Sequence, residues 1–271
     1  MISRIRHFFS VLYALFKMLP LIGLLIVLAP VQWFALRTGK LDLAGRLPMK
    51  FHKLALWCMG VRVHLDGEPL ADAPVLLVGN HVSWLDIVIL GSIAPVRFVS
   101  KDDVASWPVF GTLARLQRTV FVSRTRRIST GDTAQEMSGA LAGGDRLVLF
   151  AEGTSSHGGH VLPFRSALLG AVMGEVAADR VQAFSLGYVR CDGLPISRAE
   201  RAGLGWYGDM DLLPSLLHII HGGPMDIVVH LSTPQPASNL GTRKQAAKAL
   251  ELQVRRTLSG YLRHWPGEQS G

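Results

Sequence analysis

The sequence predicts an α/β fold with a mostly parallel central sheet flanked by helices, preceded by a long apolar segment. Two observations carry this prediction. From about Val61 onward, short β-branched runs alternate with longer amphipathic runs. Strands that alternate with helices form largely parallel sheets, because each helical crossover returns the chain to the same edge. Before that point, an uncharged apolar stretch extends from Lys17 to Arg37.

The apolar stretch is about as long as the roughly 20 residues that cross a bilayer core. Basic residues flank it, and no small-residue cleavage pattern ends it, so we expect a retained membrane-associating helical segment instead of a cleaved signal peptide. The positive charge at both ends leaves its orientation open. A membrane-crossing helix and a helix pair that enters one leaflet both fit. We therefore divide the chain into an N-terminal helical membrane anchor, residues 1–58, and an α/β domain, residues 59–271.

Seven short runs rich in β-branched and aromatic residues are predicted as strands. They are residues 61–65, 74–79, 96–100, 119–123, 146–150, 181–189 and 225–231. Six longer segments have helical periodicity. They are residues 84–93, 107–116, 133–142, 166–177, 211–220 and 242–262, of which the last is amphipathic and basic.

The composition limits the classes of binding partner that we expect. Lys and Arg total 28 against 20 Asp and Glu, and the mean hydropathy is +0.29. A basic and apolar chain fits a membrane surface or anionic substrates better than nucleic acid, and we expect no nucleic-acid partner. Cys58 and Cys191 are too few for a disulfide framework, which indicates a reducing compartment. The oligomeric state stays open.

The stretch "GNHVSWLDIVIL" contains the first candidate site. His81 follows the predicted strand 74–79 at its carboxyl end, where ligands bind in open parallel sheets. Asp86 falls in the first turn of the next helix. A carboxylate there can hold the imidazole in one tautomer and stabilise its protonated form, while the second ring nitrogen acts as a base. Taken alone, the pair is better explained by a loop histidine and a charge at a helix start.

Two further blocks, "RTVFVSR" and "FAEGTSS", follow in order, and together the three resemble the glycerolipid acyltransferase family, the 1-acylglycerol-3-phosphate O-acyltransferases and their relatives. The resemblance covers about residues 60 to 190. The family's NHxSxxD block is matched by Asn80, His81, Ser83 and Asp86, its short strand ending in arginine by Phe121 and Arg124, and its FPEGTRS block by Phe150, Glu152, Gly153, Thr154 and Ser156. Between the first two blocks, Lys101, Trp107, Pro108 and Gly111 also stand where the family has them.

The resemblance implies an enzyme, an O-acyltransferase that moves a fatty acyl group from an acyl thioester to the free hydroxyl of a lyso-lipid. His81 would be the general base and Asp86 its orienting carboxylate, without an enzyme nucleophile. The implied substrate-binding residues are Arg124, Glu152, Gly153, Thr154, Lys101 and Arg118. We expect no cofactor and no metal ion, because the paired histidines of the chain lack a convincing third ligand. The expected partners are membrane lipids and an acyl carrier protein or coenzyme A thioester.

The third block departs from the family at Ala151, where proline is usual, and at Ser155, where arginine is usual. The family's arginine is associated with the acceptor's phosphate, and serine cannot bind an anion with a charged, bidentate contact. Acyltransferases that complete ornithine lipids resemble this variant, including the later "WYGDMDLLPSLL". Lysophosphatidate and lyso-ornithine lipid are therefore both predicted acceptors.

The rival hypothesis is a non-catalytic membrane lipid-binding or scaffolding protein that retains the acyltransferase fold. Substituted His81, Asp86 or Glu152 would favour it, and all three residues are intact. Because both kinds of acyl thioester are cytosolic, we expect the inner (cytoplasmic) membrane, with the catalytic domain on the cytosolic face.

Overall fold

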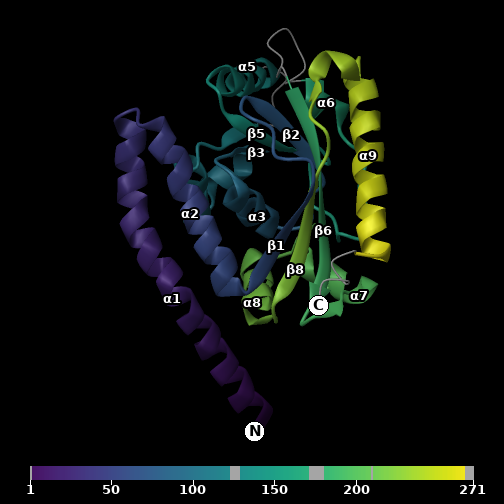
Figure 1. The fold of residues 1–271 in the computed structure, drawn as a ribbon. Helices are drawn as coiled ribbons and strands as arrows, with labels where there is room; N and C mark the ends of the chain where they lie inside the picture. Colours follow the sequence, from purple (N-terminus) through teal and green to yellow (C-terminus); the bar gives the residue numbers. More distant parts are fainter. Residues whose placement is uncertain (1, 123–128, 171–179, 209, 266–271) are drawn as a thin grey trace.

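The computed structural model describes residues 2–122, 129–170, 180–208 and 210–265. A nine-stranded sheet separates two layers of helices (Figure 1). Its main strand order is β1-β8-β6-β2-β5-β3-β4, and β7 and β9 pair with β6. The strands are β1 (Val61–Gly67), β2 (Val75–Gly79), β3 (Arg97–Lys101), β4 (Val120–Val122), β5 (Arg146–Phe150), β6 (Arg180–Cys191), β7 (Leu194–Pro195), β8 (Met225–Leu231) and β9 (Gln235–Pro236).

The predicted helices are present, with ends that differ by a few residues. The α-helices are α1 (Ile2–Arg37), α2 (Leu41–Met59), α3 (Leu85–Ile93), α4 (Phe110–Leu116), α5 (Ser129–Ala142), α6 (Ser166–Gly170), α7 (Arg198–Leu204), α8 (Leu212–His221) and α9 (Arg243–Arg263). Short 3-10 turns are η1 (Asp102–Ser106) and η2 (Ala237–Leu240). The predicted helix 166–177 is described only as far as Gly170. Helix α7 was missed, although Ser197 and Glu200 form a capping box that marks its start.

The sheet is mixed but mostly parallel, as predicted. Along the main path, each neighbouring pair is parallel except β6 and β8. All five residues of β2 are buried. Parallel strands covered on both faces have such continuous apolar runs, which is why the strands were recognisable from the sequence.

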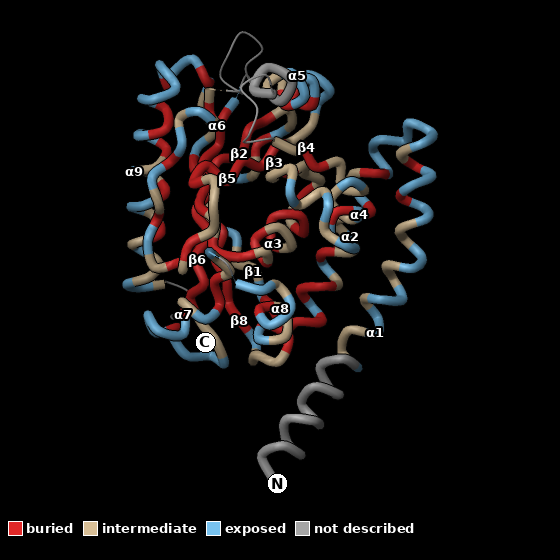
Figure 2. The backbone as a smooth tube through the Cα atoms, turned by 180° about the vertical axis from the view of Figure 1, so that it is seen from behind, coloured by how far each residue is buried: buried red, intermediate tan, exposed pale blue. Residues whose placement is uncertain are grey.

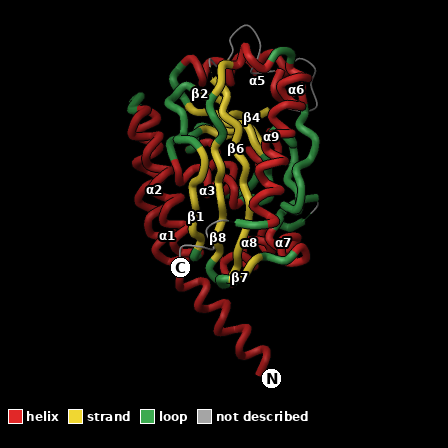
Figure 3. Tube along the Cα trace, turned by 45° about the vertical axis from the view of Figure 1, so that its right-hand side comes forward, coloured by secondary structure: helices red, strands yellow, loops and turns green. Residues whose placement is uncertain are grey.

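Alternate residues of β2 face two different cores, as the pleat of a strand requires. Val75 and Leu77 belong to the core shared with α2, α3 and α8. Leu76 and Val78 belong to the core shared with α5, α6 and α9. Figure 2 shows the central strands buried and much of the outer surface of α1 and α9 exposed. Helices α7 and α8 lie at one end of the sheet, and α5 and α6 lie at the other (Figure 3).

Helices α1 and α2 form an antiparallel hairpin beside the sheet (Figure 1). The predicted boundary at residue 58 falls at the end of α2, but α2 is not a separate unit, because Leu56 and Met59 pack into the first core. Within the described part of the chain, Phe16–Arg37 is the stretch long and apolar enough to cross a membrane. Large apolar side chains are exposed along this stretch at Phe16, Leu19, Ile22, Ile26, Val27, Val31, Trp33 and Phe34.

Candidate active site

The site begins where β2 leaves the sheet. Gly79 lies so close to β6 that a Cβ atom there would stand 2.4 Å from the carbonyl oxygen of Phe184. The side chain of Asn80 then replaces backbone pairing: its Nδ2 donates to the carbonyl of Leu186 at 2.9 Å, and its Oδ1 accepts from the N–H of Leu186 at 2.8 Å. Asn80 therefore anchors the strand end, and the next residue, His81, is placed outside the sheet.

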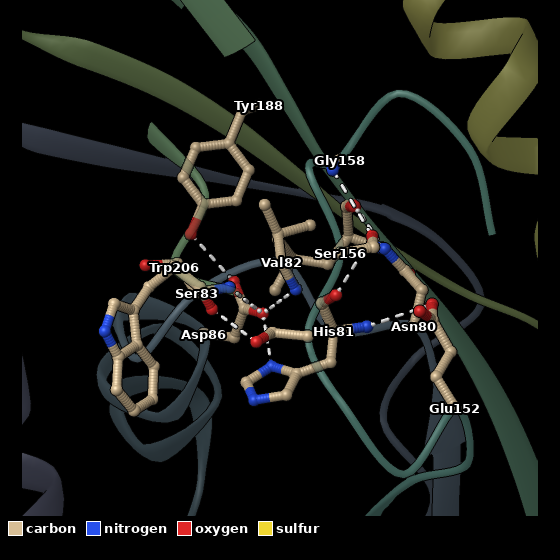
Figure 4. A network of polar contacts seen from close by, with 12 residues as sticks. Asn80, His81, Val82, Ser83, Asp86, Glu152, Ser156, Gly158, Tyr188 and Trp206 are labelled. Carbon is tan, nitrogen blue, oxygen red and sulfur yellow. Dashed lines mark hydrogen bonds and ion pairs between the residues drawn. The ribbon is translucent and has the colours of Figure 1, made fainter. Parts of the chain in front are cut away.

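The carboxylate of Asp86 is the centre of the site (Figure 4). It is fully buried. Its Oδ2 lies 2.7 Å from Nδ1 of His81 and accepts from the backbone N–H groups of Val82 and Ser83 at 2.6 and 3.0 Å. Its Oδ1 accepts the hydroxyl of Tyr188 at 2.8 Å. An anion at the start of α3 is also favoured by the helix dipole.

These contacts determine which nitrogen of His81 can act as a base. An ionised carboxylate only accepts hydrogen bonds, so Nδ1 of His81 carries the hydrogen and Nε2 keeps its lone pair. The second ring nitrogen points away from the network (Figure 4). The ring stacks on Phe150, with centroids 4.0 Å apart, and the side chain keeps 15% of its surface exposed. The imidazole is thus fixed by Asp86 and Phe150 and still accessible.

The third block holds the backbone of His81. Oε1 of Glu152 accepts the N–H of His81 at 3.3 Å, and the N–H of Ser156 donates to the carbonyl of His81 at 2.9 Å. Gly153 makes the turn between these contacts with φ +67°, a conformation that favours glycine. The first and third blocks are therefore joined by backbone hydrogen bonds into one structural unit.

Glu152 is buried, and burial raises the pKa of its carboxyl to about 8, although the N–H of His81 opposes this shift. Glu152 is therefore mostly protonated at pH 7. Its second oxygen, Oε2, has no hydrogen-bond partner among the described residues. A neutral carboxyl with one unpaired oxygen lies next to the histidine.

A segment far along the chain covers both blocks. The N–H of Trp206 donates to the carbonyl of Val82 at 3.0 Å, and the hydroxyl of Ser155 donates to the carbonyl of Trp206. The indole of Trp206 meets that of Trp107 edge to face, with ring centroids 5.6 Å apart. Ser155, the residue that departs from the family pattern, thus anchors the "GWYG" segment over the site.

The remaining predicted substrate-binding residues are placed differently. Thr154 follows Gly153 in the third-block turn, and Lys101 ends β3 at the same edge of the sheet as His81. Arg124 lies outside the described residues.

Arg118 is not brought to the site. It precedes β4 at the opposite edge of the sheet, where its guanidinium makes two contacts with Asp145, at 3.0 and 2.7 Å. Asp145, which also accepts from Arg97, immediately precedes β5. Residues that precede parallel strands lie at the amino edge of the sheet, whereas His81 lies at the carboxyl edge. We therefore leave Arg118 out of the site.

Two residues of the site were missed. Tyr188 lies in a buried strand, where a tyrosine is ordinarily a core residue, so the sequence carries no signal of its contact with Asp86. Arg165 is exposed, and its Nε donates to the carbonyl of Glu152 at 3.1 Å. The sequence signal for Arg165 was a positive charge directly after "LPF", six residues beyond Gly159.

A metal centre has no support in the described part of the chain, where no three His, Cys, Asp or Glu side chains group to hold an ion. The rings of His157 and His160 lie 4.5 Å apart in the third-block loop without a third ligand of these types.

Similarity to known proteins identifies the family of this chain. A model of the acyltransferase family matches residues 61–179. The lyso-ornithine lipid O-acyltransferase of Brucella abortus is 39% identical over 247 residues, which are 89% of this chain and 92% of that protein. The chain belongs to the glycerolipid acyltransferase family. The predicted resemblance is confirmed, and the chain is an acyltransferase.

A further relative and a solved structure are also similar to this chain. The 1-acyl-sn-glycerol-3-phosphate acyltransferase of Neisseria meningitidis is 33% identical over 153 residues, covering 54% of this chain and 59% of that protein. The crystal structure of the 1-acyl-sn-glycerophosphate acyltransferase of Thermotoga maritima is similar with a TM-score of 0.70 at 19% identity, over 97% of this chain and 98% of that one. That similarity confirms the predicted fold.

We expect Tyr188→Phe to lower the kcat of acyl transfer about tenfold, because the variant removes a hydrogen bond to a carboxylate, and such bonds contribute about 1.5–3 kcal/mol. The KM values should not change. Without the tyrosine hydroxyl, the Asp86 carboxylate keeps more negative charge and favours protonated His81, so the acidic limb of the pH–rate profile should move to higher pH.

The matched control is Tyr261→Phe, which removes a surface hydrogen bond between a tyrosine hydroxyl and Asp66. It should leave both kcat and the pH–rate profile unchanged. A lower rate in Tyr188→Phe without movement of the acidic limb would contradict a positioning role.

The raised pKa of Glu152 predicts a pH-dependent stability. Between the ordinary value of 4.5 and about 8, the unfolded chain has released this proton and the folded chain has kept it. The free energy of unfolding should therefore fall as pH rises through this window, by up to about 1.4 kcal/mol per pH unit. Glu152→Gln should lack this contribution, whereas the exposed control Glu68→Gln should retain it. Denaturant unfolding at several pH values measures the difference, and equal slopes for wild type and Glu152→Gln would contradict a protonated Glu152.

Proposed function

We propose that this chain is a membrane-associated O-acyltransferase that moves a fatty acyl group from an acyl thioester to the free hydroxyl of a lyso-lipid, with lyso-ornithine lipid as the acceptor. The observation that carries the proposal is the pair His81–Asp86, which presents an imidazole with a fixed tautomer at the carboxyl edge of the sheet. No GxSxG nucleophile motif occurs in the sequence, so the acceptor hydroxyl itself is the nucleophile.

His81 acts as general base and then as general acid. Its Nε2 takes the proton of the lipid hydroxyl while that oxygen attacks the thioester carbonyl, and Asp86 stabilises the imidazolium that results. The tetrahedral intermediate then expels the thiol as its C–S bond breaks, and the imidazolium returns the proton to the sulfur. The products are the acylated lipid and the free thiol of the donor.

Several backbone N–H groups around the site already have acceptors, which limits the groups that can stabilise the oxyanion. The N–H groups of Val82 and Ser83 already donate to Asp86, and that of His81 donates to Glu152. The N–H of Gly153 donates to the carbonyl of Phe150. We therefore assign the backbone N–H of Thr154 to the developing oxyanion.

Glu152 and Arg165 organise the acceptor in this proposal. A protonated Glu152 can donate from Oε2 to a hydroxyl or carbonyl of the lipid, since that oxygen has no partner in the described residues. Arg165, which contacts the backbone of Glu152 and is exposed, supplies a positive charge for a headgroup anion. Lys101, at the same sheet edge, and Arg124 remain proposed substrate-binding residues.

Lyso-ornithine lipid is favoured by Ser155. At the position where the family has an arginine associated with phosphate, this chain has Ser155. Its hydroxyl contacts the carbonyl of Trp206, and it supplies no guanidinium to an anion. The ornithine headgroup carries one carboxylate and one ammonium, for which a single nearby arginine is a better match than for a phosphate dianion. The relative from Brucella abortus, itself a lyso-ornithine lipid acyltransferase by name, also spans 89% of this chain.

Lysophosphatidate is the second candidate acceptor. The relative from Neisseria meningitidis is named for 1-acyl-sn-glycerol-3-phosphate, and it shares 33% identity over 54% of this chain.

Membrane association is supported by the surface around α1. Exposed apolar residues also lie on elements that contact α1: Trp57 on α2, Val109 and Phe110 at the start of α4, and Leu213 on α8. Exposed apolar side chains that gather on neighbouring elements mark a membrane or protein contact. We place it in the inner membrane on the cytosolic face, where carrier-protein and coenzyme A thioesters occur.

The direct test is His81→Ala, assayed with an acyl thioester and lyso-ornithine lipid in neutral-detergent micelles. Removing the base should lower kcat at least about 100-fold. The control is His64→Ala, which removes another contact between a histidine and a buried aspartate, Nε2 of His64 to Oδ1 of Asp226 at 2.8 Å between β1 and β8. It should keep full activity. Normal turnover by folded His81→Ala would end the proposed mechanism.

Ser155→Arg tests the acceptor. It should lower turnover of lyso-ornithine lipid and raise that of lysophosphatidate, because arginine loses the contact with Trp206 and adds a phosphate-binding cation. Ser155→Ala, the control, loses only the hydrogen bond and should slow both acceptors alike. Wild-type turnover of lysophosphatidate alone would exclude the ornithine lipid.

A further inference from the structure

The outer face of α9 carries a strong positive charge that the proposed chemistry does not use. The helix contains six Lys and Arg residues and one acidic residue, Glu251. Glu251 accepts from Arg255 and from the N–H of Phe164, so it offsets the charge of Arg255 and leaves the other five basic residues of the helix uncompensated by an acidic residue of the same helix. Lys244, Lys248, Leu252 and Arg256 follow one another at four-residue intervals and are exposed, so they form one stripe. We call this stripe, together with Arg255, the α9 face.

The α9 face points away from the apolar surface of α1. Figures 1 and 2 both show α9 on one side of the sheet and the α1–α2 hairpin on the other. The two helical layers also pack into separate cores. Two layer spacings of about 10 Å each separate the faces, which exceeds the Debye length of about 8 Å at physiological ionic strength. A membrane that binds α1 therefore leaves the α9 face to a soluble partner.

The α9 face also connects to the active site. Nη2 of Arg255 donates to the carbonyl of Val161 in the third-block loop at 3.3 Å. In the same loop, the hydroxyl of Ser156 donates to the carbonyl of His81 at 3.3 Å. Cations also act on this loop: burial lowers the pKa of His160, and His157, Arg255 and Arg198 lower it further, so the positive charge near the loop comes from the two arginines and not from His160. A partner docked on the α9 face lies beside the loop that holds His81.

We propose that the α9 face docks an acidic acyl carrier protein, which delivers the acyl thioester. This inference rests on the proposed function and specifies its donor. The stripe from Lys244 to Arg256 is about 18 Å long, which suits the acidic surface of a protein better than the compact phosphates of coenzyme A. Leu252, 43% exposed, stands within the basic stripe and gives the apolar contact that protein interfaces combine with a charged rim.

The test compares Lys244→Glu/Lys248→Glu with a control of equal charge change on the hairpin, Lys50→Glu/Lys53→Glu. Both pairs are exposed and lie outside the site. In neutral-detergent micelles, the α9 variant should raise the KM for an acyl carrier protein thioester about tenfold at low salt, with kcat and acceptor KM unchanged. The control should match wild type. The milder Lys244→Gln/Lys248→Gln should be intermediate, and thermal unfolding checks that each variant is folded.

Binding of unacylated holo carrier protein to the full-length protein, measured without turnover, separates the two proposals. Binding that weakens in the α9 variant and with added salt supports the docking surface, whatever the turnover. Unchanged binding and unchanged KM, or turnover of acyl coenzyme A alone, overturns it and leaves the acyltransferase mechanism standing. Carrier binding by a protein that transfers acyl groups from neither donor refutes the proposed function instead.

Discussion

The buried carboxylate of Asp86 is the constraint on which the rest of the site depends. A charge without solvent is costly unless hydrogen bonds replace its hydration. Here the donors come from four places: the ring of His81, the backbone of Val82 and Ser83, and the hydroxyl of Tyr188 on β6. The loop after β2, the start of α3 and strand β6 must all be in place before this charge is stabilised. The first block therefore adopts its fold and positions His81 only when these three elements are together.

The third block completes the same structure from outside. Glu152 and Ser156 bind the backbone of His81 on both sides, and Trp206 binds Val82. Motifs separated by about 70 residues lie together because each satisfies polar groups that the other leaves open when the chain turns away from the sheet. It also gives Ser155 a structural role, since its contact with the carbonyl of Trp206 holds Trp206 against the first block.

The sequence predicted the sheet well because buried parallel strands are continuous apolar runs. It placed His81 just after such a run and Asp86 in the first turn of the next helix, while the roles of both residues were implied by the resemblance to the family. It failed where a contact depends on which strands are neighbours. Tyr188 reaches Asp86 only because β6 pairs with β2, and 102 residues separate the two side chains. Arg118 was expected near the substrate from its closeness in sequence to the second block, but it precedes β4 and so lies at the wrong edge for that role. Helix α7 is short and polar, and its capping box was its clearest signal.

The central claim is that Asp86 fixes His81 in the tautomer that acts as a base, and Asp86→Asn tests it most directly. The carboxamide keeps the size of the side chain but can donate to Nδ1, which leaves the hydrogen on Nε2. The account predicts that kcat for acyl transfer to the lyso-lipid falls by about 1,000-fold or more, while the variant remains folded and its acceptor KM is unchanged. A folded Asp86→Asn variant with a kcat close to that of the wild type would contradict it.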